Sequence, residues 1–208
     1  WILLDGVTLQ CGDAACLRVD QADKVFLTLA AGTENTLIGP ESMSDAALED
    51  ETNAVIFAHD DLTINGSGSL TITAGCLHGL DANDDLVITG GTLNVTAPKD
   101  GIRGNDSLRI TEAEITVSAG DDGLVVNHDC GYLVIASGRI DIISGDDAIH
   151  TAGEVTIEDG MLTLNAEDDA IHSDTAIRVY GGNITITDCY EGLEAVIVEQ
   201  YGGDVTIY

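Results

Sequence analysis

Residues 144–172 read SGDDAIHTAGEVTIEDGMLTLNAEDDAIH and contain one motif twice. Asp146–His150 and Asp168–His172 are both DDAIH, and they start 22 residues apart. Related segments occur at Asp100–Ile102, Asp122–Leu124 and Glu191–Leu193, so that the aspartate or glutamate before each Gly or Ala recurs at intervals of 22, 25, 22 and 22 residues. A fixed period of this length is the signature of a repeat protein.

Two pairs of alternating apolar residues follow the same period. The first pair is Leu86 and Ile88, repeated as Leu108/Ile110, Leu133/Ile135, Val155/Ile157 and Ile177/Val179. The second is Leu93 and Val95, repeated as Ile115/Val117, Ile140/Ile142, Leu162/Leu164, Ile184/Ile186 and Val205/Ile207. Alternation at period two predicts short β-strands, three per repeat, with glycine turns between them. A unit of this size buries its apolar side only by stacking on its neighbours. We therefore predict an all-β fold, a right-handed parallel β-helix (solenoid) with coils of about 22 residues.

The repeat also predicts the domain organisation. We expect residues 1–208 to form a single β-helix domain, with irregular N-terminal coils over residues 1–75 and regular 22-residue coils over residues 76–208. Val25–Leu29 and Leu62–Gly66 are predicted strands of the early coils. The polar segment Ser42–Asn53 is expected to loop out, and the one 25-residue interval to contain a short insertion at His128–Gly131.

The composition limits the partners. The chain has 37 Asp and Glu against 7 Lys and Arg, a formal net charge of −30, yet 44% of its residues are hydrophobic. Such a chain can bury a core, but it lacks the cations that nucleic acids and anionic membranes require. No apolar run is long enough to span a membrane. The charge favours a cation as partner, or a neutral or acidic polymer bridged by metal.

The cysteines leave the redox compartment open. There are five: Cys11, Cys16, Cys76, Cys130 and Cys189. Cys11 and Cys16 are close enough in sequence to pair, which would suit an oxidising compartment. All five could equally be buried thiols.

The repeated carboxylates are the main candidates for a functional site. Asp100, Asp122, Asp147, Asp169 and Glu191 share one position of the repeat, and Asp121, Asp146 and Asp168 share the position before it. Neighbouring coils lie about 4.8 Å apart, so these carboxylates should stack. Two charges about 5 Å apart repel by roughly 3 kcal/mol at an effective dielectric constant of about 20. Lys99 and Arg103 are the only cations nearby in sequence, so we predict that a bound cation balances the column.

Calcium fits this ligand set best, because it takes six to eight oxygen ligands. A second polar column contains Asn105, Asn127 and Asp174, with Asp106 directly after Asn105. The candidate calcium ligands are Asp100, Asn105, Asp106, Asp121, Asp122, Asn127, Asp146, Asp147, Asp168, Asp169, Asp174 and Glu191. The alternative is a solvated acidic edge with an asparagine ladder. His150 and His172 should also stack, and we expect an exposed or carboxylate-bonded pair there rather than a zinc site.

Three groups of segments resemble one known family. They are Ala22–Leu37, Asp60–Leu70, and the GDDAIH and Tyr190–Glu194 segments of the later coils. The chain resembles the bacterial extracellular carbohydrate-binding proteins with a polysaccharide-lyase-like β-helix, over nearly its whole length. This resemblance implies a secreted or surface protein that binds calcium between coils and binds acidic plant polysaccharide such as polygalacturonate (pectin), with cellulose as a second candidate ligand, and that has no lyase activity. Carried over by position, the implied metal ligands are the Asp pairs 121–122, 146–147 and 168–169, and less directly Asp100 and Glu191. Lys99 departs from the pattern, since later coils have Asp there.

These observations favour a binding protein over an enzyme. A lyase would need Arg103 or Lys99 as the base, and two basic groups would then serve both binding and catalysis. Outward Thr116, Thr163, Thr185 and Thr206 form a column, interrupted by Asp141, that could present hydroxyls to a polysaccharide. The alternative function is structural: subunits that stack end to end into a calcium-stabilised extracellular filament or matrix.

Overall fold

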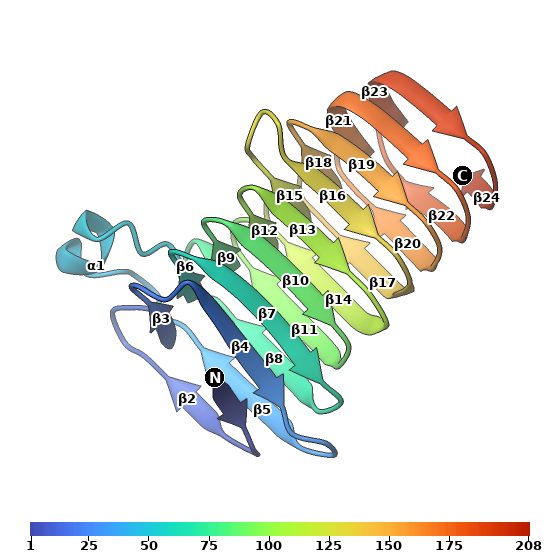
Figure 1. Cartoon of the computed structure of the whole chain (residues 1–208). Helices are drawn as coiled ribbons and strands as arrows, with labels where there is room; N and C mark the ends of the chain where they lie inside the picture. Colours follow the sequence, from blue (N-terminus) through green and yellow to red (C-terminus); the bar gives the residue numbers. More distant parts are fainter.

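The computed structural model describes all residues, 1–208, and consists of stacked coils that run from the N-terminal to the C-terminal end of one elongated body (Figure 1). Every strand pairing is parallel, and each joins residues of neighbouring coils. A typical coil contains β12 (Ile102–Gly104), β13 (Ser107–Ile110) and β14 (Ala113–Ala119), one on each of three faces. The predicted parallel β-helix with coils of about 22 residues is confirmed.

One face is a nine-stranded sheet with one strand from each coil. In spatial order it contains β2 (Thr8–Gln10), β5 (Glu34–Ile38), β8 (Ser69–Thr73), β11 (Thr92–Ala97), β14, β17 (Gly138–Ile143), β20 (Met161–Asn165), β22 (Asn183–Asp188) and β24 (Asp204–Ile207).

The other two faces are the arms of a single 15-stranded sheet. The first arm contains β3 (Leu17–Val19), β6 (Ala54–Ala58), β9 (His78–Ala82), β12, β15 (Leu124–Val126) and β18 (Ile149–Thr151). The second arm contains β1 (Ile2–Leu4), β4 (Lys24–Leu29), β7 (Asp61–Gly66), β10 (Asp85–Thr89), β13, β16 (Tyr132–Ile135) and β19 (Glu154–Ile157). The long strands β21 (Asp169–Val179) and β23 (Glu191–Gln200) run through both arms, which joins them.

The core is a set of stacked apolar columns, as the repeat predicts. Leu86, Leu108, Leu133, Val155 and Ile177 are in register on consecutive second-arm strands, and all are fully buried. The nine-stranded sheet contributes equivalent columns, and 45 buried residues form one continuous cluster. Because burial of one Leu or Ile contributes about 2 kcal/mol, coil stacking is the main stabilising interaction.

Glycine occupies turns that other residues cannot. Gly138 has a φ of 121°, and a Cβ there would lie 2.5 Å from the carbonyl oxygen of Ala113 in the preceding coil. A side chain at this position would therefore separate the coils as well as strain the backbone.

The irregular segments lie where expected, with one difference. β4 and β7 confirm the two predicted early strands, and five residues separate β15 from β16, where two separate β12 from β13. The Ser42–Asn53 segment leaves the stack as expected but contains a helix, α1 (Asp45–Glu49), which the sequence did not predict (Figure 1). The hydroxyl of Ser44 caps it by accepting from the N–H of Ala47, and one turn is too short to show a period.

Two further findings concern the cysteines and the membrane. All five cysteines are free thiols, and Cys16 Sγ lies 3.1 Å from the carbonyl oxygen of Ile38. None of the helical structure has the length and apolarity of a membrane span.

Candidate metal centre at the carboxylate corner

The repeated aspartates lie at one corner of the solenoid, where the chain passes from the nine-stranded sheet into the first arm. The strand register aligns Ile102, Leu124, Ile149 and Ile171. The residue two positions earlier in each coil is an aspartate, so the four form a column: Asp100, Asp122, Asp147 and Asp169. We call this column the carboxylate ladder.

Each rung of the ladder is bonded to the next by a side chain and a backbone group. Oδ1 of Asp122 accepts the N–H of Asp147 at 3.0 Å, and Oδ1 of Asp147 accepts the N–H of Asp169 at 2.9 Å. Oδ1 of Asp100 accepts the N–H of Asp122 at 3.4 Å. Asp100, Asp147 and Asp169 are buried. The aspartates therefore satisfy backbone donors of the corner, in addition to any role with a ligand.

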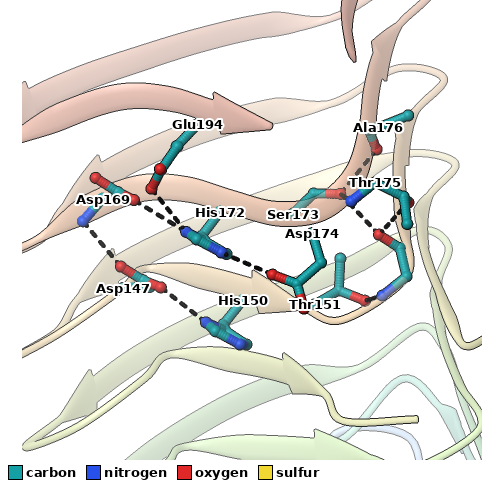
Figure 2. Close-up of polar contacts among 11 residues, drawn as sticks. Asp147, His150, Thr151, Asp169, His172, Ser173, Asp174, Thr175, Ala176 and Glu194 are labelled. Carbon is teal, nitrogen blue, oxygen red and sulfur yellow. Dashed lines mark hydrogen bonds and ion pairs between the residues drawn. The ribbon is translucent and has the colours of Figure 1, made fainter. Parts of the chain in front are cut away.

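The second oxygen of most rungs bonds a cationic or imidazole side chain three residues later. His150 Nδ1 lies 2.8 Å from Oδ2 of Asp147, and His172 Nδ1 lies 3.1 Å from Oδ2 of Asp169 (Figure 2). The two imidazoles stack in parallel, with ring centroids 5.0 Å apart. The expected carboxylate-bonded histidine pair is therefore present, and it supplies charge balance that the sequence argument had assigned to a metal alone.

The rung of Asp100 is balanced differently. Arg103 Nε lies 3.4 Å from Oδ2 of Asp100, and His78 Nδ1 lies 3.2 Å from the same oxygen. Arg103 also contacts Nε2 of His78 at 2.8 Å and Oδ2 of Asp81 at 3.9 Å. Burial would raise the pKa of Asp100, but His78 and Arg103 together lower it.

Asp122 has no such partner, because the residue three positions later is Val125. Burial raises the pKa of Asp122 to about 6, and the nearby charges of Asp100 and Asp147 add to the increase. This rung is the least compensated of the four.

The last rung is crowded with carboxylates. Glu194 occupies the position of His172 in the next coil, and its Oε2 lies 3.0 Å from His172 Nδ1. Burial, followed by the contact with Glu194, raises the pKa of Asp169 to about 6. Burial would lower the pKa of His172, but its bonds to Asp169 and Asp174 raise it to about 9. His172 is therefore a cation at neutral pH.

Four groups of side chains bring their potential ligand atoms within 4.8 Å of one another. Two contain a histidine: Asp122–Asp147–His150 and Asp147–Asp169–His172. Two contain only carboxylates: Asp146–Asp147–Asp168 and Asp169–Glu191–Glu194. The acidic clusters can hold a metal ion, and the two oxygen-only clusters have the donors that a hard cation prefers.

The remaining predicted ligands lie in different places. Asp121 pairs with Lys99, with Nζ 3.0 Å from Oδ2. Asn105, Asp106 and Asn127 lie at the opposite end of the first-arm strands, so they share no cluster with the ladder. Asp174 is at that end too, but its Oδ1 lies 3.2 Å from His172 Nε2.

Three residues of the corner were not among the predicted ligands: His150, His172 and Glu194. The sequence feature that could have identified them is a constant spacing: each lies three residues after Asp147, Asp169 or Glu191. On an isolated strand this spacing puts the two side chains on opposite sides. The bend of the chain at the corner allows the contact.

Three comparisons relate this chain to known proteins, and one of them compares the fold. A family model described as carbohydrate-binding domain-containing protein matches residues 1–207. A relative with the same description, from Acetivibrio thermocellus, is 36% identical over 97 residues, which are 46% of this chain and 34% of that protein. The matched part thus spans about a third of the length of this relative. The structure of the polysaccharide lyase-like protein from C. thermocellum, a gadolinium derivative, is similar with a TM-score of 0.76 and 27% identity over 98% of this chain and 77% of that chain.

Proposed function

The chain belongs to the family of carbohydrate-binding domain-containing proteins, and on this premise we propose that it binds an acidic polysaccharide of the polygalacturonate type without cleaving it. Calcium ions held by surface carboxylates of the corner would bridge the protein and the glycan. With a net charge of −30, the protein repels a polyanion unless a cation lies between them.

The observation that carries the proposal is the cluster of Asp146, Asp147 and Asp168. It offers only oxygen donors, and Asp146 and Asp168 are exposed while Asp147 is buried. Burial, together with the neighbouring carboxylates Asp147, Asp121 and Asp168, raises the pKa of Asp146, which indicates an excess of negative charge at this point. A calcium ion there would keep coordination positions on the solvent side, where a glycan carboxylate can bind.

One further observation supports a hard cation. Asp169, Glu191 and Glu194 form a second oxygen-only cluster one coil further along the axis. Carboxylate oxygens are the ligands that calcium prefers.

The environment of Arg103 supports binding without cleavage. A lyase needs a free base to remove the proton next to the sugar carboxylate. Arg103 is engaged by Asp100, His78 and Asp81, and its side chain is only 21% exposed. Lys99 is exposed but paired with Asp121. Secretion and end-to-end stacking into a filament stay predictions.

Affinity electrophoresis through gels that contain polygalacturonate tests this function. Migration should be retarded with calcium and not with EDTA, and the double variant D146N/D168N should lose the retardation. Asp129→Asn is the control, because Asp129 is exposed and lies in the insertion loop, outside every cluster. Equal migration in calcium and in EDTA would contradict the bridging ion, and unsaturated sugar ends in the product would contradict the absence of cleavage.

A further inference from the structure

The outward side of the nine-stranded sheet differs from the rest of this acidic surface. In its six central regular strands (β8, β11, β14, β17, β20 and β22) the outward positions are almost all hydroxyls and amides. They are Ser69, Thr71, Thr73, Thr92, Asn94, Thr96, Thr116, Ser118, Thr163, Asn165, Asn183, Thr185 and Thr187, with Glu114, Arg139, Asp141, Ile143, Met161 and Asp188. We call this surface the hydroxyl face.

Of the four charged residues on the hydroxyl face, Glu114, Arg139 and Asp141 are paired or hydrogen-bonded, and Asp188 lies at the end of β22. Arg139 bonds Asp141 with both ends of its guanidinium, Nε to Oδ2 at 2.9 Å and a terminal nitrogen to Oδ1 at 3.1 Å. Glu114 accepts from the hydroxyl of Thr92 at 3.4 Å. A protein of net charge −30 thus carries one broad face that is nearly uncharged.

A groove of about 360 Å³ lies on this face, over β14, β17, β20 and β22. The register places Thr116, Asp141 and Thr163 in one column along its length. Longer side chains stand in the columns beside it, among them Arg139 and Ile143, which line the groove. The groove therefore runs along the solenoid axis, across the strands.

The groove is lined by both apolar and hydrogen-bonding groups, which match the two kinds of surface on a sugar ring. A pyranose has apolar C–H surfaces and a rim of hydroxyls that donate and accept hydrogen bonds. Ile143 is 61% exposed beside the groove and supplies apolar surface there. The hydroxyls of Thr116 and Thr163 and the amide of Asn165 supply donors and acceptors.

The spacing of the coils suits a linear chain of sugars. The coils repeat about every 4.8 Å, which is close to the length of one sugar ring. A glycan that lies along the axis therefore meets a similar set of side chains at each coil. Because Arg139 is already paired with Asp141, the groove offers no free cation to a sugar carboxylate.

We propose that the hydroxyl face, centred on the groove beside Thr163 and Ile143, is a second glycan-binding surface that takes an uncharged polysaccharide chain and needs no metal. It rests on the carbohydrate binding of the proposed function but not on the calcium-bridged corner, which lies between this sheet and the first arm. The two surfaces would bind glycans of different charge.

Affinity electrophoresis in EDTA tests the second surface, with separate gels that contain a mixed-linkage β-glucan, a xylan or a galactomannan. At least one of these should retard the native protein. Thr163→Arg fills the groove and should weaken the retardation by about tenfold in apparent Kd, while Ile143→Ser should weaken it less. Thr156→Arg is the matched control, because Thr156 is an outward threonine of a regular strand, β19, on the second arm.

Each outcome decides the proposal independently of the corner. Retardation by an uncharged glycan in EDTA that Thr163→Arg weakens and Thr156→Arg leaves intact supports it. It is overturned if none of the three glycans retards the protein, if Thr163→Arg binds like the control, or if binding requires calcium. The D146N/D168N variant should keep uncharged-glycan binding, and Thr163→Arg should keep calcium-dependent polygalacturonate binding, so failure of one surface is distinguishable from failure of the other.

Discussion

The carboxylate ladder and the hydroxyl face are both polar columns produced by the same 22-residue repeat, yet they use their polar atoms differently. In the ladder, each aspartate is at least half-buried and bonds the next coil, as Asp147 does with the N–H of Asp169. On the hydroxyl face, Thr116 and Thr163 line an open groove and have no hydrogen bond through their hydroxyls within the protein. A repeated polar residue can therefore be part of the internal bonding or part of a surface, and burial distinguishes the two.

This difference has an energetic consequence. Buried charges must be balanced locally, and the ladder uses backbone N–H groups, Arg103, His150 and His172 for this. Exposed hydroxyls need no such partners, because water satisfies them. Substitutions at the corner should therefore lower the stability of the protein. Substitutions on the hydroxyl face should change glycan binding and leave the stability unchanged.

The largest expected effect is that of calcium on the free energy of unfolding. At a free calcium concentration of 100 times Kd, one ion that binds only the folded state should raise the free energy of unfolding by about 2.7 kcal/mol. Urea denaturation at fixed ionic strength, in calcium and in EDTA, measures this. D146N/D168N should lose most of the increase, and Thr163→Arg should keep all of it. Equal free energies of unfolding in the two solutions would contradict a calcium site at the corner.

Asp147→Ala should lower the free energy of unfolding in EDTA by about 2 kcal/mol, because the N–H of Asp169 and the imidazole of His150 lose their acceptor. Asp147→Asn keeps an oxygen for the N–H of Asp169, so its loss should be clearly smaller. If the two variants were equally stable, the ladder bond would not contribute to folding.

The pH dependence of stability should be dominated by the corner. The pKa of His172 is raised from 6.5 to about 9 in the fold, so its contribution is fully present below pH 6.5 and is lost as the pH rises through about 9. Asp122 and Asp169, with pKa values raised from 3.8 to about 6, likewise destabilise the fold as the pH rises from 3.8 through 6. Urea denaturation of metal-free protein from pH 5 to 9.5 should show stability that declines with pH.

His172→Gln should flatten the upper part of this decline, between pH 6.5 and 9, and leave the lower part. Asn183→Gln on the hydroxyl face is the comparison variant, with no expected change in either part. A profile of His172→Gln that is parallel to that of the native protein would assign the decline to other groups.

The smallest effect is expected for Thr163→Ala. The free energy of unfolding should change by less than about 0.5 kcal/mol, since the residue lies on an outward surface and its hydroxyl has no partner in the protein. Uncharged-glycan binding in EDTA should nevertheless weaken. A stability loss comparable to that of Asp147→Ala would show that the hydroxyl face is also part of the internal bonding.

The solenoid could be predicted from the sequence, because the period, the alternation of Leu86 with Ile88 and the glycine turns are all local patterns that only stacking can satisfy. The column of repeated aspartates could be predicted as well, since equal spacing in a solenoid means equal position on each coil. α1 was missed, because a single helical turn capped by Ser44 shows no period.

The contacts that the polar columns make could not be predicted from the sequence. The contacts of His150 with Asp147 and of Arg103 with Asp100 depend on the bend at the corner, and the separation of Asn105 from the ladder depends on which end of the strand each residue occupies. The groove between Arg139 and Ile143 depends on side chains from four coils. Burial and contact are properties of neighbouring coils, and a pattern within one coil does not contain them.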